Sequence, residues 1–110
     1  MSDHNRSLLE AILSVLGRIA FPPEKLAPLV LSKGAGPKQL DAFNLCDGTR
    51  SQGEIAKMLN IDAGNFSKTV ARWIHGGIVF RIGDGRDAKL VSLYRLEPVS
   101  KKRKRKKKGE

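Results

Sequence analysis

Residues 51–62 read SQGEIAKMLNID, and this stretch contains the signals that decide the fold. Ser51 and Glu54 have the S-x-x-E spacing of a capping box, in which the serine hydroxyl accepts from the Glu54 amide and the carboxylate reaches back to the Ser51 amide. A helix is therefore expected to begin directly after Ser51. Asp62 can cap a second helix, because its carboxylate can accept from amides of the following turn. The stretch predicts two short helices joined by a tight turn.

The second helix is expected to run from Ala63 to about His75, with two glycines as its exit. At 100° per residue its apolar side chains share one side: Phe66, Val70, Trp73 and Ile74. The opposite side is rich in donors and contains no acid: Gly64, Asn65, Lys68, Arg72 and His75. Such a face suits the major groove, where Asn pairs with adenine and Arg or Lys with guanine. Ser67 and Thr69 near the rim are expected to reach phosphate or bases of either type.

A β-hairpin is expected after the glycines. The sequence alternates with a period of two, as a half-buried strand does, with Ile78, Phe80 and Ile82 against Val79 and Arg81. Residues 83–87 read as a turn, and Lys89 to Leu96 form a second β-rich run. Arg86 at the tip could enter a narrow minor groove or contact phosphate. Because Asp84 and Asp87 flank it, a simple polar turn is the alternative.

The N-terminal segment predicts an amphipathic helix with an unusually wide apolar side. Its apolar residues fall within an arc of about 160°: Leu8, Leu9, Ile12, Leu13, Val15, Leu16, Ile19 and Ala20. An ordinary surface helix buries a stripe of roughly 100° or a little more. Leu8 to Phe21 is therefore expected to cover its own domain with one edge and to meet a second copy, as a homodimer, with the other. A well-buried helix in a monomer is the alternative.

Prolines and glycines divide the next part of the chain into two further helices. Pro22-Pro23 ends the first helix, because proline lacks the amide donor. A short helix is expected from Pro23 to Lys33, and residues 34–36 read as a connection. Pro37 can open a third helix that ends at Asp47-Gly48.

This order of helices, tight turn, helix and hairpin predicts a mainly α fold with a small β-hairpin (α+β), arranged as a winged helix-turn-helix. Residues Gln39 to Leu96 resemble the winged-helix domain of MarR-like prokaryotic and archaeal transcription regulators. The resemblance covers just over half the chain and is carried by residues 51–62, the stretch from Gly64 to Ile74, and Gly76-Gly77-Ile78-Val79. It implies a DNA-binding regulator whose helix Ala63 to His75 enters the major groove. The family builds its dimer with additional long helices, and dimerisation in that manner would require Leu8 to Phe21 and the next helix to replace those elements.

The charge balance also points to a polyanionic partner. The 110 residues include 21 Lys plus Arg and 11 Asp plus Glu, a net charge of +10. Residues 1–100 carry 13 − 10 = +3, so most of the surplus lies in one run: Lys101, Lys102, Arg103, Lys104, Arg105, Lys106, Lys107 and Lys108. Such a tail is expected to be disordered when free and to bind nucleic acid without sequence preference by releasing counterions. In a eukaryote the same run would serve as a nuclear import signal, and a solubilising terminus is the bland alternative.

Several classes of protein are disfavoured. Cys46 is the sole cysteine, His4 and His75 lie far apart, and no spacing fits a zinc site, so no metal is expected. The glycine-rich fragments lack the rest of a nucleotide-binding motif, so neither a cofactor nor an enzyme is expected. The apolar stretch Leu8 to Phe21 is too short to span a bilayer. The expected location is cytoplasmic and nucleoid-associated, or nuclear if the source is eukaryotic.

The sequence therefore predicts three regions: N-terminal helices at 1–36, a winged helix-turn-helix domain at 37–98 and a basic tail at 99–110. The expected function is sequence-specific or semi-specific binding of double-stranded DNA in transcription regulation. The expected DNA contacts are Arg50, Gly64, Asn65, Ser67, Lys68, Thr69, Arg72, Arg86 and Lys101 to Lys108. Two alternatives remain at this point: an RNA-binding winged helix, and a protein-interaction module within a larger nucleic-acid assembly.

Overall fold

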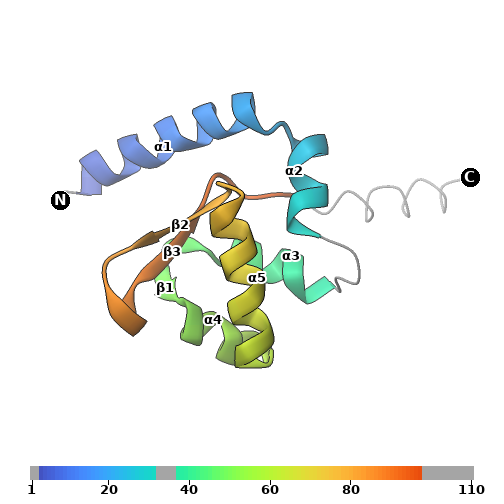
Figure 1. Ribbon diagram of the computed structural model, residues 1–110. Helices are drawn as coiled ribbons and strands as arrows, with labels where there is room; N and C mark the ends of the chain where they lie inside the picture. Colours follow the sequence, from blue (N-terminus) through green and yellow to red (C-terminus); the bar gives the residue numbers. More distant parts are fainter. Residues whose placement is uncertain (1–2, 32–36, 98–110) are drawn as a thin grey trace, which may run out of the picture.

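The computed structural model describes residues 3–31 and 37–97, which are mainly helical with a small antiparallel sheet (Figure 1). The elements in chain order are α1 (Asp3–Ala20), α2 (Pro23–Val30), α3 (Pro37–Asn44), β1 (Asp47–Ser51), α4 (Gln52–Leu59), α5 (Ala63–His75), β2 (Val79–Ile82), a 3₁₀ turn (Gly85–Asp87) and β3 (Lys89–Ser92). The three strands lie in the order β1-β3-β2. The expected α+β class is confirmed within the described residues.

The capping box at Ser51 is confirmed. The Glu54 amide donates to Ser51 Oγ at 3.2 Å, and the Ser51 amide donates to Glu54 Oε1 at 2.8 Å. Asn60 ends α4 in the left-handed conformation, with φ 55° and ψ 51°, a geometry that asparagine tolerates better than most residues. Asp62 then caps α5 by accepting from the Asn65 amide at 2.9 Å. Local signals alone thus set the ends of both helices and the turn between them.

Trp73 lies at the centre of the core, as expected. Its ring meets Phe43 of α3 and Phe66 of α5 edge-on, with centroids 5.4 and 6.1 Å away. Its Nε1 donates to the Val30 carbonyl oxygen of α2 at 3.4 Å. Cys46 is a buried member of the same core, and burial, aided by the charge of Asp47, raises the pKa of its thiol to about 12. The indole therefore joins three helices.

The hairpin is confirmed, but the expected alternation of its first strand is wrong. Val79 is fully buried, whereas Phe80 and Ile82 are 41% and 54% exposed. The buried part is Ile78-Val79 at the base of the hairpin, directly after α5. Beyond it the edge strand β2 projects past the helices and its side chains are exposed, whereas Leu90 of β3, paired with Arg81, is fully buried (Figure 1).

Three element boundaries also differ from expectation. β3 ends at Ser92 rather than Leu96, because Leu96 instead exchanges two hydrogen bonds with the Asn44 side chain of α3, at 2.8 and 2.9 Å. β1 was not expected, since its sequence DGTRS has no apolar alternation and it forms a sheet edge. Helices α2 and α3 end at Val30 and Asn44, earlier than expected. Lys33 and the connection at 34–36 lie outside the described residues.

Helix α1 lies across one side of the domain and is attached mainly near its C-terminal end (Figure 1). A Cβ at Gly17 would lie 2.8 Å from Leu93 Cβ, so the close approach of α1 requires glycine there. The Tyr94 hydroxyl donates to the Phe21 carbonyl oxygen at 2.6 Å, and the Arg18 guanidinium lies 4.2 Å from the Tyr94 ring centroid. Among the described helices, none combines the length and apolar character that crossing a membrane requires.

Removing the α4 cap should destabilise the domain. Ser51→Ala leaves the Glu54 amide without its side-chain acceptor, and we expect the free energy of unfolding to fall by about 1 kcal/mol. Urea unfolding followed by circular dichroism measures this loss. Ser7→Ala, at an exposed site in α1, is the matched control and should change stability by less than about 0.5 kcal/mol. Equal effects of the two substitutions would contradict the capping account.

The charge of Glu54 should make stability depend on pH. The Ser51 amide and then the Lys89 ammonium, 3.9 Å away, hold the pKa of this carboxyl below its ordinary value. A pKa lowered by folding contributes stability at neutral pH, which is lost as the pH falls through the folded-state pKa. Glu54→Gln keeps the shape and the acceptor, so it should be less stable than the parent at pH 7, and the gap should narrow at a second, acidic pH where the carboxyl is protonated. Urea unfolding of both proteins at the two pH values measures this. A gap of the same size at both would contradict it.

Candidate nucleic-acid interface

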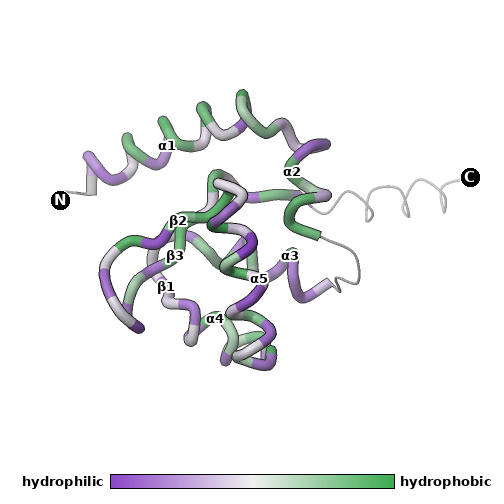
Figure 2. The backbone as a smooth tube through the Cα atoms, viewed as in Figure 1, coloured by the Kyte–Doolittle hydropathy of each residue, from purple (hydrophilic) through white to green (hydrophobic). Residues whose placement is uncertain are grey.

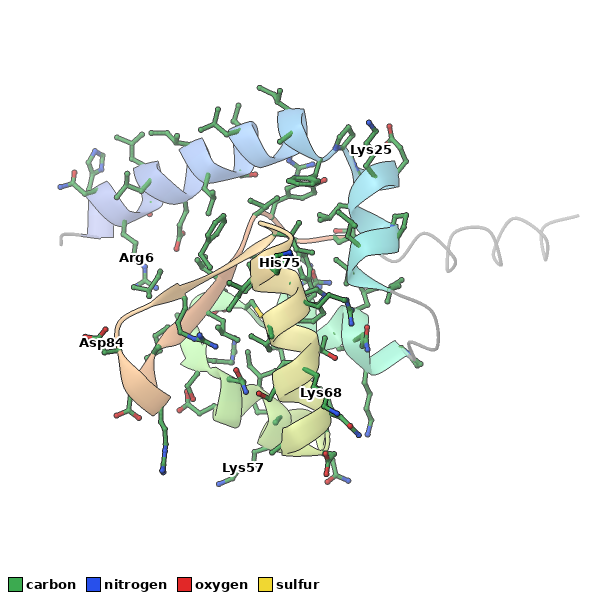
Figure 3. All side chains as sticks on the ribbon, viewed as in Figure 1. Arg6, Lys25, Lys57, Lys68, His75 and Asp84 are labelled. Carbon is green, nitrogen blue, oxygen red and sulfur yellow. The ribbon has the colours of Figure 1, made fainter. Side chains whose placement is uncertain are left out.

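The outer face of α5 is exposed and carries its polar groups away from the core. Lys68 and His75 lie two helical turns apart on the side opposite Trp73, and both are exposed (Figure 3). Gly64 and Ala71 flank Lys68 on one side of this face, where the side chains are small, and Asn65 and Arg72 flank it on the other. Ser67, also exposed, lies on one edge. Within α5, all of which is described, no acidic residue occurs.

Arg72 is held against its own domain. Its Nη2 lies 3.4 Å from the Val30 carbonyl oxygen and 3.5 Å from Gln39 Oε1. The same Val30 oxygen accepts from Trp73 Nε1 and belongs to the last residue of α2. The Arg72 guanidinium therefore interacts with the C-terminal end of α2, where the helix dipole favours a positive charge. Its guanidinium points toward α2 and α3 rather than straight outward from α5.

Thr69 differs from its expected place at the rim. It is 8% exposed, and its hydroxyl donates to the Asn65 carbonyl oxygen at 3.3 Å, as a threonine inside a helix often does. Its hydroxyl is therefore engaged by the backbone of its own helix. The exposed Asn65 remains accessible beside it and shares a surface depression with Lys38.

Lys38 is a cation that the sequence reading did not single out. It lies at the start of α3, and its Nζ is 3.4 Å from the Asn60 carbonyl oxygen in the turn before α5. The depression between α3 and α5 brings it next to Asn65. Only the tertiary packing of α3 against the α4–α5 turn brings these residues together, so no local signal could have identified it.

The hairpin places two arginines on the other flank. Arg86 is exposed in the 3₁₀ turn at the tip, between the exposed Asp84 and Asp87. Arg81 of β2 lines the same shallow pocket as Arg86, against the start of α4, and its Nη2 is 3.4 Å from Gln52 Oε1. Arg81 was expected only as part of the strand alternation and not as a site residue.

Arg50 is occupied by its own strand. Its Nη1 lies 2.9 Å from Asp47 Oδ2 and 3.3 Å from the Leu45 carbonyl oxygen. Burial raises the pKa of the Asp47 carboxyl, but hydrogen bonds from Thr49 and the charge of Arg50 outweigh it, and the pKa is lowered. The ion pair holds Arg50 along β1 and reduces its availability to a phosphate.

The basic run Lys101 to Lys108 lies outside the described residues. Among residues 3–31 and 37–97, no three His, Cys, Asp or Glu side chains come together as metal ligands would. Comparison of the chain with protein-family models, with curated protein sequences and with solved structures found no match.

Replacing Arg72 should lower the stability of the domain more than replacing Lys68. Arg72→Ala removes two hydrogen bonds to α2 and α3, and we expect a loss of about 1 kcal/mol in unfolding free energy. Lys68→Ala removes an exposed side chain from the outer face, so its effect should stay within about 0.5 kcal/mol. Urea unfolding of the two variants tests this, and an equal loss in both would contradict the structural role of Arg72.

Proposed function

We propose that residues 37–97 form a winged helix-turn-helix domain that binds double-stranded DNA, without enzymatic activity, as a transcription regulator. Helix α5 would enter the major groove, and the hairpin of β2 and β3 would act as the wing. The basic tail, Lys101 to Lys108, would add affinity that depends strongly on salt.

The arrangement of the elements supports the winged-helix interpretation. Helix α3, the capped α4 and α5 follow one another, with a short strand before α4 and a hairpin directly after α5. The sheet order β1-β3-β2 sets the hairpin beside the start of α4. In such an arrangement the second helix of the pair can enter a groove of the DNA, and the projecting hairpin can contact the duplex beside it.

One observation carries the proposal: the exposed, acid-free outer face of α5 on a helix whose inner face is locked by Trp73. Phosphate repels acidic groups, and base edges in the major groove offer acceptors to Lys and Arg. Lys68 projects from the middle of this face, where Gly64 and Ala71 leave room for the helix to approach the base edges closely. We propose Lys68 as the principal base contact.

The other residues would position the complex. Asn65 and Lys38 lie on the α3 side of α5, and Arg81 and Arg86 lie on the hairpin side. Contacts to phosphate from both flanks would fix the register of α5 without carrying sequence information. In this arrangement Arg72 supports the scaffold rather than reading bases.

Replacing Lys68 should weaken DNA binding without unfolding the domain. For the full chain with Lys68→Ala, we expect the affinity for a bound duplex to fall roughly tenfold, because one groove contact is lost. Lys25→Ala is the matched control, since Lys25 is an exposed lysine on α2 far from Lys68 (Figure 3), and its effect should be less than about threefold. Fluorescence anisotropy at fixed salt measures both. Equal losses would mean that Lys68 acts only through net charge.

A chain ending at Ser100 separates the domain from the tail. Loss of up to eight phosphate contacts should make the slope of log affinity against log salt shallower by at most about 7, while Lys68→Ala should still weaken what remains. Loss of all affinity with the tail would contradict the α5 proposal. Tighter binding of folded RNA than of duplex DNA, at the same salt, would contradict the choice of DNA.

A further inference from the structure

Helix α1 exposes a continuous row of large apolar side chains that its own domain does not cover. We name this row the apolar stripe; it consists of Leu8, Leu9, Ile12, Val15, Leu16 and Ile19, which are between 47% and 73% exposed. The hydrophobic colour of α1 lies mainly on the side that faces away from the sheet (Figure 2), and aliphatic side chains stand out from that side (Figure 3). A patch of this size on a monomer usually marks an interaction site.

The orientation of α1 accounts for the exposure. At 100° per residue, the side that meets the domain carries Arg6, Leu13 and Gly17, whereas the apolar stripe spans an arc of about 120° centred on Ile12. Arg6 points back to the Gly48 carbonyl oxygen at 3.4 Å, and Arg18 lies over the Tyr94 ring. Both cationic side chains therefore point away from the apolar stripe, and none of the six side chains of the stripe is charged. Arg6 and Gly17 of α1 thus face the domain, whereas its most apolar side is not covered by any of the described residues.

We infer that the apolar stripe binds the apolar stripe of a second copy of this chain, with the two α1 helices antiparallel about a two-fold axis at Ile12. Ile12 lies near the middle of the helix and at the centre of the arc of the stripe. In this register Leu8 faces Leu16, Leu9 faces Val15 and Ile12 faces itself, while Ile19 lies opposite Asn5. The central five residues of the stripe are thus self-complementary, as a two-fold interface requires. Antiparallel pairing also sets the two helix dipoles in the favourable orientation.

The available area reaches the lower limit for a specific interface. Six apolar side chains about half exposed supply on the order of 500 Å² per copy, roughly 1,000 Å² for the pair, against about 800 Å² per partner in an interface of standard size. The patch continues from Leu9 into the groove between α1 and the sheet, which Leu13, Ile82 and Val91 line. Ile82 is itself 54% exposed, so it extends the apolar surface that a second copy can cover.

The molecular mass of the full chain tests this inference in the absence of DNA, so its outcome is independent of the proposed DNA binding. Light scattering and sedimentation equilibrium from about 1 to 100 µM should give twice 12.1 kDa, about 24 kDa, at the upper concentrations. Ile12→Glu places a charge at the centre of the stripe and should return the mass to 12.1 kDa with an unchanged helical circular dichroism spectrum. Met58→Glu makes the same change at a 56% exposed apolar residue of α4 and should stay dimeric.

Engineered cysteines test the register. Ile12→Cys should cross-link the two copies after mild oxidation, since the two positions face each other and Cys46 is buried. Ile19→Cys should not, because its counterpart lies (19 − 5) × 1.5 Å, about 21 Å, further along the partner helix. A monomer at every concentration, or a dimer unaffected by Ile12→Glu, would overturn the inference. Equal cross-linking at both positions would overturn the antiparallel register.

Discussion

The burial of the Trp73 indole is the constraint on which the rest of the structure depends. Its ring edges meet Phe43 and Phe66, and its Nε1 reaches the Val30 carbonyl oxygen, so one side chain joins α2, α3 and α5. Aromatic pairs in this geometry add to the energy of burial, and the indole donor is satisfied. Because Trp73 sets the rotation of α5 about its axis, Lys68 on the opposite side must face outward. A rotation of one residue, or 100°, would break the ring contacts and leave the indole donor without an acceptor.

The surface of the molecule divides into two regions with different chemistry. The outer face of α5, flanked by Lys38 on one side and Arg81 on the other, offers donors and positive charge. The apolar stripe of α1 consists of aliphatic side chains and carries no charge. These regions belong to separate elements, and α1 is attached mainly through Leu93 and Tyr94. Substitutions should therefore alter the proposed self-association and the proposed nucleic-acid binding separately, and the proposed pairing would bring two copies of α5 into one particle.

Local signals explain which parts of the fold were predictable. The capping box at Ser51, the cap at Asp62 and the prolines before α2 and α3 act over three or four residues, so the sequence alone predicts these helix starts. The faces of β2 depend instead on where the core ends, and period-two alternation cannot reveal that. β1 has no apolar pattern and becomes a strand only because β3 lies beside it.

The candidate site likewise combines residues whose direction follows from local signals with residues that are placed by tertiary packing. The outward direction of Lys68 follows from the period of α5 and the apolar character of its other side. The partners of Arg72 and Arg50, Val30 and Asp47, come from tertiary packing and a local turn, and these cations are consequently less available than their sequence positions suggest. Lys38 joins the site only through the packing of α3.

The most direct test of the central claim is an NMR titration of the uniformly ¹⁵N-labelled full chain with a short DNA duplex. The account predicts the largest amide shift changes at Gly64, Ser67, Lys68 and Ala71 on the outer face of α5, with smaller ones near Arg86. It also predicts little change in α1 at a fixed protein concentration. Shift changes confined to residues 101–108 would contradict the account, because they would assign DNA binding to the tail alone.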